Sequence, residues 1–150
     1  MSQLARIRIA AAIAVAALPL SSAFALDMVA TASITGACSL TSVAPMPFGS
    51  LDQITGGAVP KTSTAVYACT NGVTPTVSVG GATDGSTGFS GLLAKGTDTI
   101  AYTVKWTNPG AATGFSTPVN LTLNGEIPAG AYEDKPAGSY TQTVAVTIAP

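Results

Sequence analysis

The chain has 150 residues, of which 47% are apolar and only 9% charged, and seven acidic against six basic residues give a net charge of −1. This balance argues against a nucleic-acid partner held through phosphate contacts. The sequence contains no histidine, which excludes a histidine-based catalytic triad and a histidine-ligated metal site. The length suits one domain with a core of ordinary size.

The first 25 residues have the pattern of an export signal. Arg6 and Arg8 give a basic start, an apolar stretch follows over residues 9–20, and Ala23 and Ala25 are small residues where a signal peptidase reads. This stretch is shorter than the roughly 20 residues that a membrane-spanning helix needs. We expect residues 1–25 to be cleaved and residues 26–150 to form the exported domain, with a buried helix as the alternative.

The segment at 26–34 alternates in polarity. Five apolar residues fall on one parity, with Val29 as an exception on the other, and they are Leu26, Met28, Ala30, Ala32 and Ile34. A period of two is typical of a strand with one buried face. Taken alone, this pattern predicts an ordinary first strand.

Short runs rich in Val, Ile, Thr and Tyr follow, separated by Gly and Pro. Their alternation predicts strands at residues 65–69, 76–79, 99–107, 119–123 and 140–148. Residues 80–96 are rich in glycine, so we expect a long surface loop or an irregular edge there. No window shows a helical apolar stripe, and the fold class is therefore an all-β antiparallel sandwich.

Cys38 and Cys69 are the two cysteines, and an even number in an exported chain favours a disulfide. Two free buried thiols are the alternative, since two sulfurs without histidine leave a zinc ion short of ligands. The acidic residues are scattered, and no base stands ready to activate a Ser or Thr nucleophile. We expect no enzyme activity, no catalytic residues, no metal and no cofactor.

Several motifs, in this order, resemble the spore coat U domain family, which includes the pilins of archaic chaperone-usher pili. The motifs are the alternating N-terminal segment, Thr-Gly-Ala-Cys at 35–38, Phe-Gly-Ser-Leu at 48–51, Tyr-Ala-Cys-Thr-Asn-Gly at 67–72, and Gly-Ser-Tyr at 138–140 before an alternating last strand. The resemblance covers nearly all of residues 26–150, although Gln142 stands where the family often has Asp.

The resemblance implies an incomplete immunoglobulin-like sandwich that lacks its last strand. Residues 26–34 of the next subunit would complete it by donor-strand exchange, and the sequence ends two residues after Ile148, where we expect no further strand. The implied partners are other pilin subunits, a periplasmic chaperone and an outer-membrane usher. The implied location is a fimbrium at the cell surface, with roles in attachment and biofilm. A monomeric adhesive module, or a spore or cell coat protein that forms no pilus, is the alternative.

The predicted core consists of residues that lie on the apolar parity of their runs or in the Phe-Gly motif. They are Phe48, Tyr67, Trp106, Leu121, Leu123, Val144 and Val146. Trp106, Tyr102 and Tyr132 could stack on a sugar, but because Trp106 and Tyr102 share the parity of Ile100, core packing is favoured. The position in the fibre and the surface that is bound do not follow from the sequence.

Overall fold

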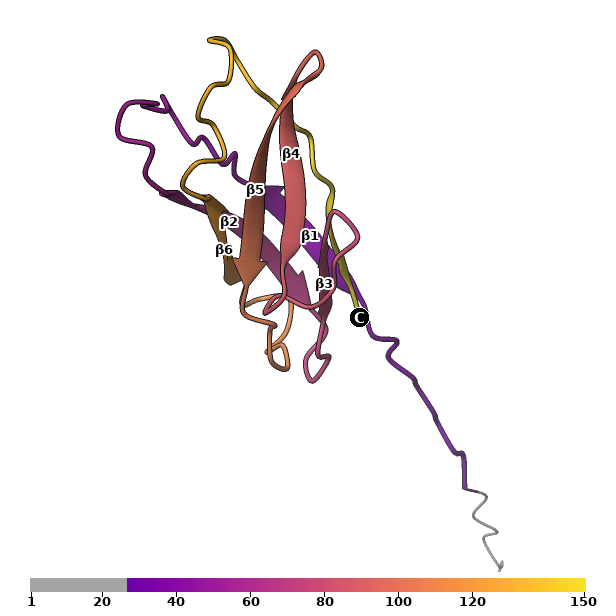
Figure 1. Ribbon diagram of the computed structural model, residues 1–150. Coiled ribbons are helices and arrows are strands. Elements are labelled where there is room, and N and C mark those ends of the chain that lie inside the picture. Colours follow the sequence, from indigo (N-terminus) through magenta and orange to yellow (C-terminus); the bar gives the residue numbers. More distant parts are fainter. Residues whose placement is uncertain (1–26) are drawn as a thin grey trace, which may run out of the picture. The chain divides into compact units, whose positions relative to one another are not determined.

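The computed structural model describes residues 27–150, which form seven strands (Figure 1). The expected export signal and Leu26 lie outside the described residues. Residues 27–150 contain no helix with the length and apolarity that a membrane crossing needs. The strands are β1 (Cys38–Val43), β2 (Val59–Cys69), β3 (Thr76–Val79), β4 (Phe89–Lys95), β5 (Asp98–Trp106), β6 (Val119–Ile127) and β7 (Val146–Ala149).

The strands form two antiparallel sheets. The larger has the order β1-β2-β6-β5-β4, and the smaller contains β3 and β7. The longest pairing joins β2 to β6, from Val59 opposite Ile127 to Tyr67 opposite Val119. Within the described residues, β1 pairs only with β2 and β7 only with β3, so both are edge strands. The fold is the predicted incomplete immunoglobulin-like antiparallel sandwich.

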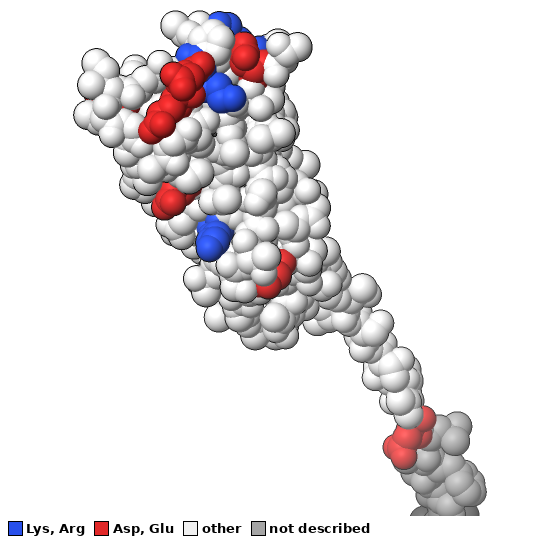
Figure 2. Space-filling model, in the orientation of Figure 1, with Lys and Arg blue, Asp and Glu red and all other residues white. Residues whose placement is uncertain are grey.

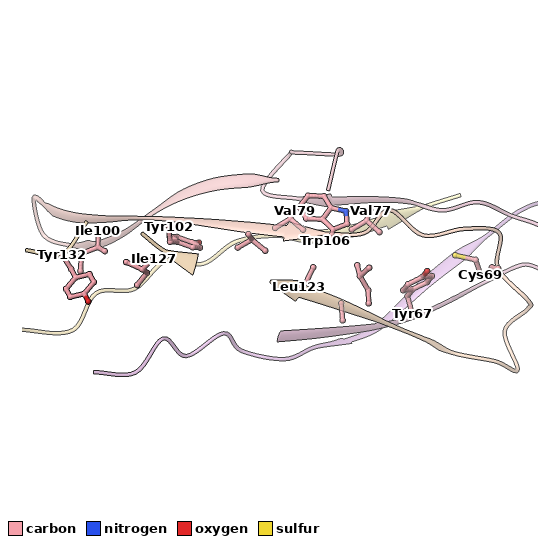
Figure 3. Close-up of a cluster of buried hydrophobic side chains, with 14 residues drawn as sticks. Tyr67, Cys69, Val77, Val79, Ile100, Tyr102, Trp106, Leu123, Ile127 and Tyr132 are labelled. Carbon is pink, nitrogen blue, oxygen red and sulfur yellow. The ribbon is translucent and has the colours of Figure 1, made fainter. Parts of the chain in front are cut away.

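The core lies between the inward faces of these strands, and Figure 3 shows it from the side. β6 illustrates its origin, because its residues alternate regularly between buried and exposed as the sequence alternates in polarity. Of the predicted core residues, four are buried: Tyr67, Trp106, Leu121 and Leu123. The other three are half-buried and pack against the core from its rim: Phe48, Val144 and Val146.

Residues 80–96 contain β4 in place of a long surface loop, and β4 lies at the edge of the larger sheet, which agrees with the alternative expectation of an irregular edge. It pairs along its whole length with β5, from Phe89 opposite Val104 to Lys95 opposite Asp98. Glycine is needed within it, because a Cβ on Gly91 would lie 2.6 Å from a ring carbon of Tyr102. The glycines that allow this close approach also hide the alternation, which is why the sequence pattern missed the strand.

The last strand is shorter than the predicted run at 140–148. Its partner β3 has four residues and ends at Val79, and the next residue, Gly80, turns the chain away with a φ of 56°. The bond from the Gly80 N–H to the Ala145 carbonyl, 2.8 Å long, follows the β3–β7 ladder. Before Ala145 the chain runs along β4 instead, where Ala94 and Thr141 exchange two backbone bonds of 3.0 and 3.1 Å.

Residues 27–37 belong to neither sheet, which differs from the first strand that their alternation predicts. The first strand of the domain is β1, which begins at Cys38 and which the sequence pattern did not predict. The apolar side chains of Met28 and Ile34 are 90% and 88% exposed. A strand needs a partner for its backbone groups, and the sheets of this chain do not supply one to residues 27–37.

Candidate functional site: an open groove at the rim of the sandwich

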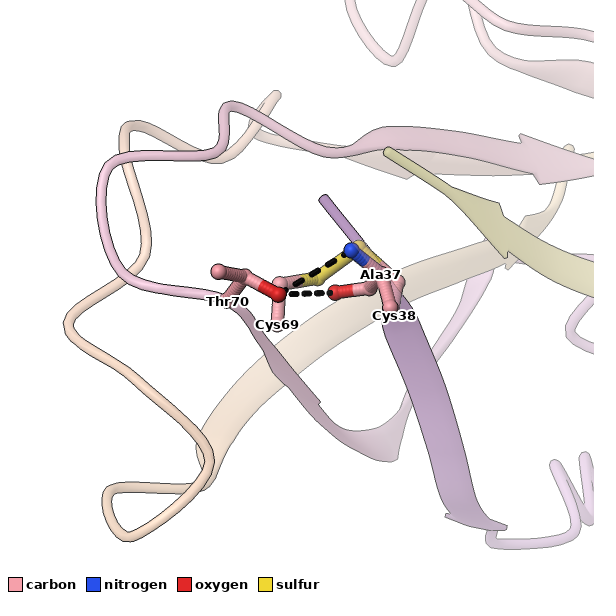
Figure 4. Close-up of a disulfide and its surroundings, with 4 residues drawn as sticks. All are labelled: Ala37, Cys38, Cys69 and Thr70. Carbon is pink, nitrogen blue, oxygen red and sulfur yellow. Dashed lines mark hydrogen bonds between the residues drawn. A yellow bond between two sulfur atoms is a disulfide. The ribbon is translucent and has the colours of Figure 1, made fainter. Parts of the chain in front are cut away.

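A disulfide and two hydrogen bonds link the start of β1 to the end of β2 (Figure 4). Cys38 and Cys69 lie opposite each other in the β1–β2 ladder, with Cα atoms 4.1 Å apart, and form a disulfide. The Thr70 hydroxyl accepts a hydrogen bond from the Ala37 N–H at 3.0 Å, and the Thr70 N–H donates to the Ala37 carbonyl at 2.9 Å. The chain is therefore held to the domain from Ala37 onward.

A groove of about 1040 Å³ opens between two segments that lie outside the sheets. One wall is the segment that follows β1, residues 45–53, and the other is the segment before β7, residues 135–142. Leu93, Ile100 and Ile127 lie between these walls, and the last two are core residues with exposed fractions of 2% and 0%. Figure 3 places Ile100, Ile127 and Tyr132 together at one end of the core. The groove thus reaches down to the hydrophobic core.

The first wall is held down by close packing. A Cβ on Gly125 of β6 would lie 2.1 Å from the Met46 sulfur and 3.2 Å from the Phe48 ring, so only glycine lets this wall lie against the sheet. The Phe48 ring also contacts the Tyr102 ring edge to face, with centroids 5.7 Å apart. These contacts make the first wall part of the core.

The second wall is attached to β4. Besides the bonds between Ala94 and Thr141, the Gln142 side-chain oxygen accepts the Leu92 N–H at 2.9 Å. The Lys95 ammonium group donates to the Ala137 carbonyl and lies 6.0 Å from the centre of the Tyr140 ring. Both walls are therefore anchored, and the space between them is built into the fold.

One end of the groove is closed by polar bonds between the walls. The Gln53 amide donates to the Tyr132 carbonyl at 3.0 Å and to the Lys135 carbonyl at 2.6 Å. The Tyr132 hydroxyl donates to the Gly57 carbonyl at 2.7 Å. These bonds hold the turn that follows β6 against the turn that precedes β2.

Strands β1 and β7, each at an edge of its sheet, leave apolar side chains incompletely covered. On β1 and β7 the inward residues are only half-buried although they pack against the core: Cys38, Leu40, Val146 and Ile148. Each edge strand also has one row of backbone groups without a sheet partner in the described chain. Half-covered apolar residues beside an unpaired edge are what a sandwich leaves when one strand is missing.

Charged side chains lie at one end of this surface, where Asp52 and Lys135 line the groove. In Figure 2, the charged side chains of the visible face gather toward the end that carries the β4–β5 turn. At that end, partial burial and, second, the charge of Asp98 raise the pKa of Tyr140 above its usual value. The phenol therefore stays neutral beside the groove, where it donates to the Pro136 carbonyl at 2.8 Å.

The described residues offer little for other chemistry. Residues 27–150 bring together no group of three side chains able to hold a metal ion. Trp106, Tyr102 and Tyr132 are 4%, 5% and 2% exposed, so none of them presents a ring to a sugar. What the site offers is a groove with an apolar floor between two irregular walls, one of which follows β1 and the other precedes β7.

Sequence reasoning did not predict this groove. It did not assign Leu93, Ile100 and Ile127 to a site, and it considered Tyr132 only as a ring that could stack on a sugar. The walls at 45–53 and 135–142 contain three prolines and two glycines in an irregular order, so no periodicity marked them. Their approach to each other depends on tertiary contacts, above all those of Gly125 and Gln53.

The fold and groove define a class: an immunoglobulin-like sandwich with an open place for one more strand. The profile of the Spore Coat Protein U domain family matches residues 24–147, and the chain belongs to that family. This membership indicates a protein of the coat or pilus type. The comparison with curated proteins found no significant match. The comparison with solved structures likewise found none.

Proposed function

We propose that this protein is a structural, non-enzymatic subunit of a surface fibre, and that residues 26–34 of one copy fill the open groove of another. The observation that carries the proposal is a match between two features of the same chain. The groove lacks a strand, and the N-terminal segment has a strand pattern but joins neither sheet. Exchange of this segment between copies would satisfy both.

The physical gain comes from apolar burial and backbone pairing. Nine extended residues span about 30 Å and direct five side chains to one face. Burying Met28 and Ile34 would contribute roughly 1.5–3 kcal/mol each, and Ala30 and Ala32 much less. The larger side chains near the ends would therefore anchor the strand, while the edges of β1 and β7 would pair with its backbone.

A subunit with an empty groove exposes apolar surface and unpaired edges, which favour aggregation. We therefore include a periplasmic chaperone that covers the groove before assembly, and an outer-membrane usher that exchanges it for the next subunit. Export through the periplasm would also supply the oxidising conditions that the Cys38–Cys69 disulfide requires. Attachment and biofilm formation would then be properties of the fibre.

The proposal is tested by expressing the chain with a periplasmic chaperone and an outer-membrane usher of this family's pili, then comparing boiled and unboiled samples on a denaturing gel. The expected result is a ladder of polymers that disappears on boiling and is absent when residues 26–34 are deleted. A wild-type chain that gives no ladder, or a deletion variant that still gives one, would contradict it.

A coat protein that forms no pilus is the second candidate, and the family description itself favours it. Such a protein could use the same groove without an usher. The two candidates differ in the gel experiment: a ladder that forms without the usher favours the coat protein, and one that requires the usher favours the pilin.

A further inference from the structure

Two large apolar side chains are displayed at opposite ends of the domain. Ile54 is 97% exposed and Phe115 is 51% exposed. Phe115 lies shortly before β6, which begins at Val119, whereas Ile54 precedes β2, whose first residue pairs with the last residue of β6. The length of β6, nine residues or about 30 Å, therefore separates the two ends.

Both side chains stand on turns that are fixed by hydrogen bonds. At one end, the Asp52 carboxylate accepts the Ile54 N–H at 2.9 Å, and its carbonyl accepts the Gly56 N–H at 3.1 Å. At the other, the Thr117 N–H donates to the Gly114 carbonyl at 3.2 Å across Phe115. Fixed turns lose little conformational freedom on binding, which favours a contact role over a mobile loop.

The end that carries Phe115 is also where the N-terminal segment leaves the domain. Ala37 is bonded to Thr70, and the next loop residues are bonded to the Phe115 loop: the Gly72 N–H donates to the Ala112 carbonyl at 2.8 Å, and the Ala112 N–H to the Val73 carbonyl at 2.7 Å. The loops at 70–75 and 107–118 contain no charged residue. They form an uncharged end around the exit of the segment.

The connection between a donated strand and its own domain is short. Only Thr35 and Gly36 separate Ile34 from Ala37, so these two points lie at most about 11 Å apart even in a fully extended chain. At that distance the two domains must touch. The uncharged end of the donor therefore faces whichever end of the acceptor the strand leaves from.

The direction of the strand decides which end that is. A strand antiparallel to β7 would leave beside the groove end closed by Gln53, next to Ile54, and like copies would stack head to tail without closing. A parallel strand would leave beside Pro150, which lies near Gly36, and two like ends would meet in a closed pair. A fibre requires the first arrangement.

We propose that the Phe115 end of each copy packs against the Ile54 end of the next, as a second contact beside the donated strand. This inference rests on the proposed function. The contact joins a second copy of the same chain, buries two apolar side chains that are otherwise exposed, and fixes the angle between neighbouring domains.

The test is a double variant, Ile54→Cys with Phe115→Cys, assembled into fibres and then oxidised. A matched control pairs Phe115→Cys with Thr122→Cys, which lies on the exposed face of β6. The expected result is a ladder that survives boiling without reductant in the double variant and is absent from the control. If the double variant forms no polymer while the control still does, this would also support the contact, because both positions are exposed and neither lines the groove.

Two results would overturn it. A heat-labile ladder without covalent links would leave the proposed function intact and remove the Phe115–Ile54 contact. Covalent dimers from Phe115→Cys alone would show that like ends meet and that the strand runs parallel to β7. A wild-type chain that forms no ladder would instead refute the proposed function, and this contact with it.

Discussion

Replacement of Ile34 by aspartate should prevent polymerisation while leaving the domain intact. Ile34 is 88% exposed in the free chain, so the change removes no contact within the fold. In the filled groove, the lost burial costs roughly 1.5–3 kcal/mol. Placing an unpaired carboxylate against apolar side chains adds several kcal/mol more. A total of at least about 4 kcal/mol weakens each junction roughly a thousandfold.

Ser33→Asp is the matched control, because it adds the same charge at the neighbouring exposed position of opposite parity. Its side chain would point away from the groove, and surface substitutions of this kind usually change stability by less than about 0.5 kcal/mol. Both variants are expressed with the chaperone and usher, and unboiled gels compare their ladders. Equal ladders from the two variants would refute the reasoning, since parity would then have no role.

Three further predictions concern the domain itself. Mass spectrometry without reductant should find Cys38 bonded to Cys69, and loss of this bond, which spans 31 residues, should cost roughly 3–4 kcal/mol in urea unfolding; two alkylatable thiols in folded protein would contradict this. Trp106→Ala should lower the free energy of unfolding by about 3–5 kcal/mol. Trp106→Phe should lower it clearly less, because this change also removes the buried Nε1–H that has no partner within the described residues. Equal losses of stability from the two variants would argue against an unpaired Nε1–H. Hydrogen bonds from Ser86 and Thr87 lower the pKa of Asp84 from 3.8 to about 2, so the stability that its carboxylate provides above pH 3.8 should be lost as the pH falls through about 2; the difference in unfolding midpoint from Asp84→Asn should shrink over that range, and a difference independent of pH would exclude this role.

The sequence predicted the parts of the fold that depend on local alternation. Residues 99–107 and 119–123 fall in β5 and β6 because one face of each strand meets the core along its length. The alternation did not predict β4, because Gly91 must lie against Tyr102 and therefore interrupts the pattern of apolar and polar side chains. The start of β7 at Val146 is set by its partner Val79, the last residue of β3, which a local pattern cannot reveal.

The groove itself was not predicted. The alternation at 26–34, on which the proposed donor strand rests, is visible in the sequence because five apolar residues there keep a period of two. The groove is not visible, because it combines irregular segments far apart in the chain. The hydrogen bond from Gln53 to Lys135 and the packing of Met46 on Gly125 hold the two walls of the groove in position. These contacts exist only once the sandwich has formed.

The most direct test of the account adds a synthetic peptide of residues 26–36 to a subunit that lacks residues 26–34, and follows the melting temperature. The peptide should bind one to one and raise the melting temperature, because a ligand that binds only the folded state stabilises it. A control peptide with the same residues in an order that breaks the alternation should have no effect. A truncated subunit whose melting temperature is unchanged by the native peptide, or raised equally by both peptides, would contradict the claim that this groove receives the N-terminal strand.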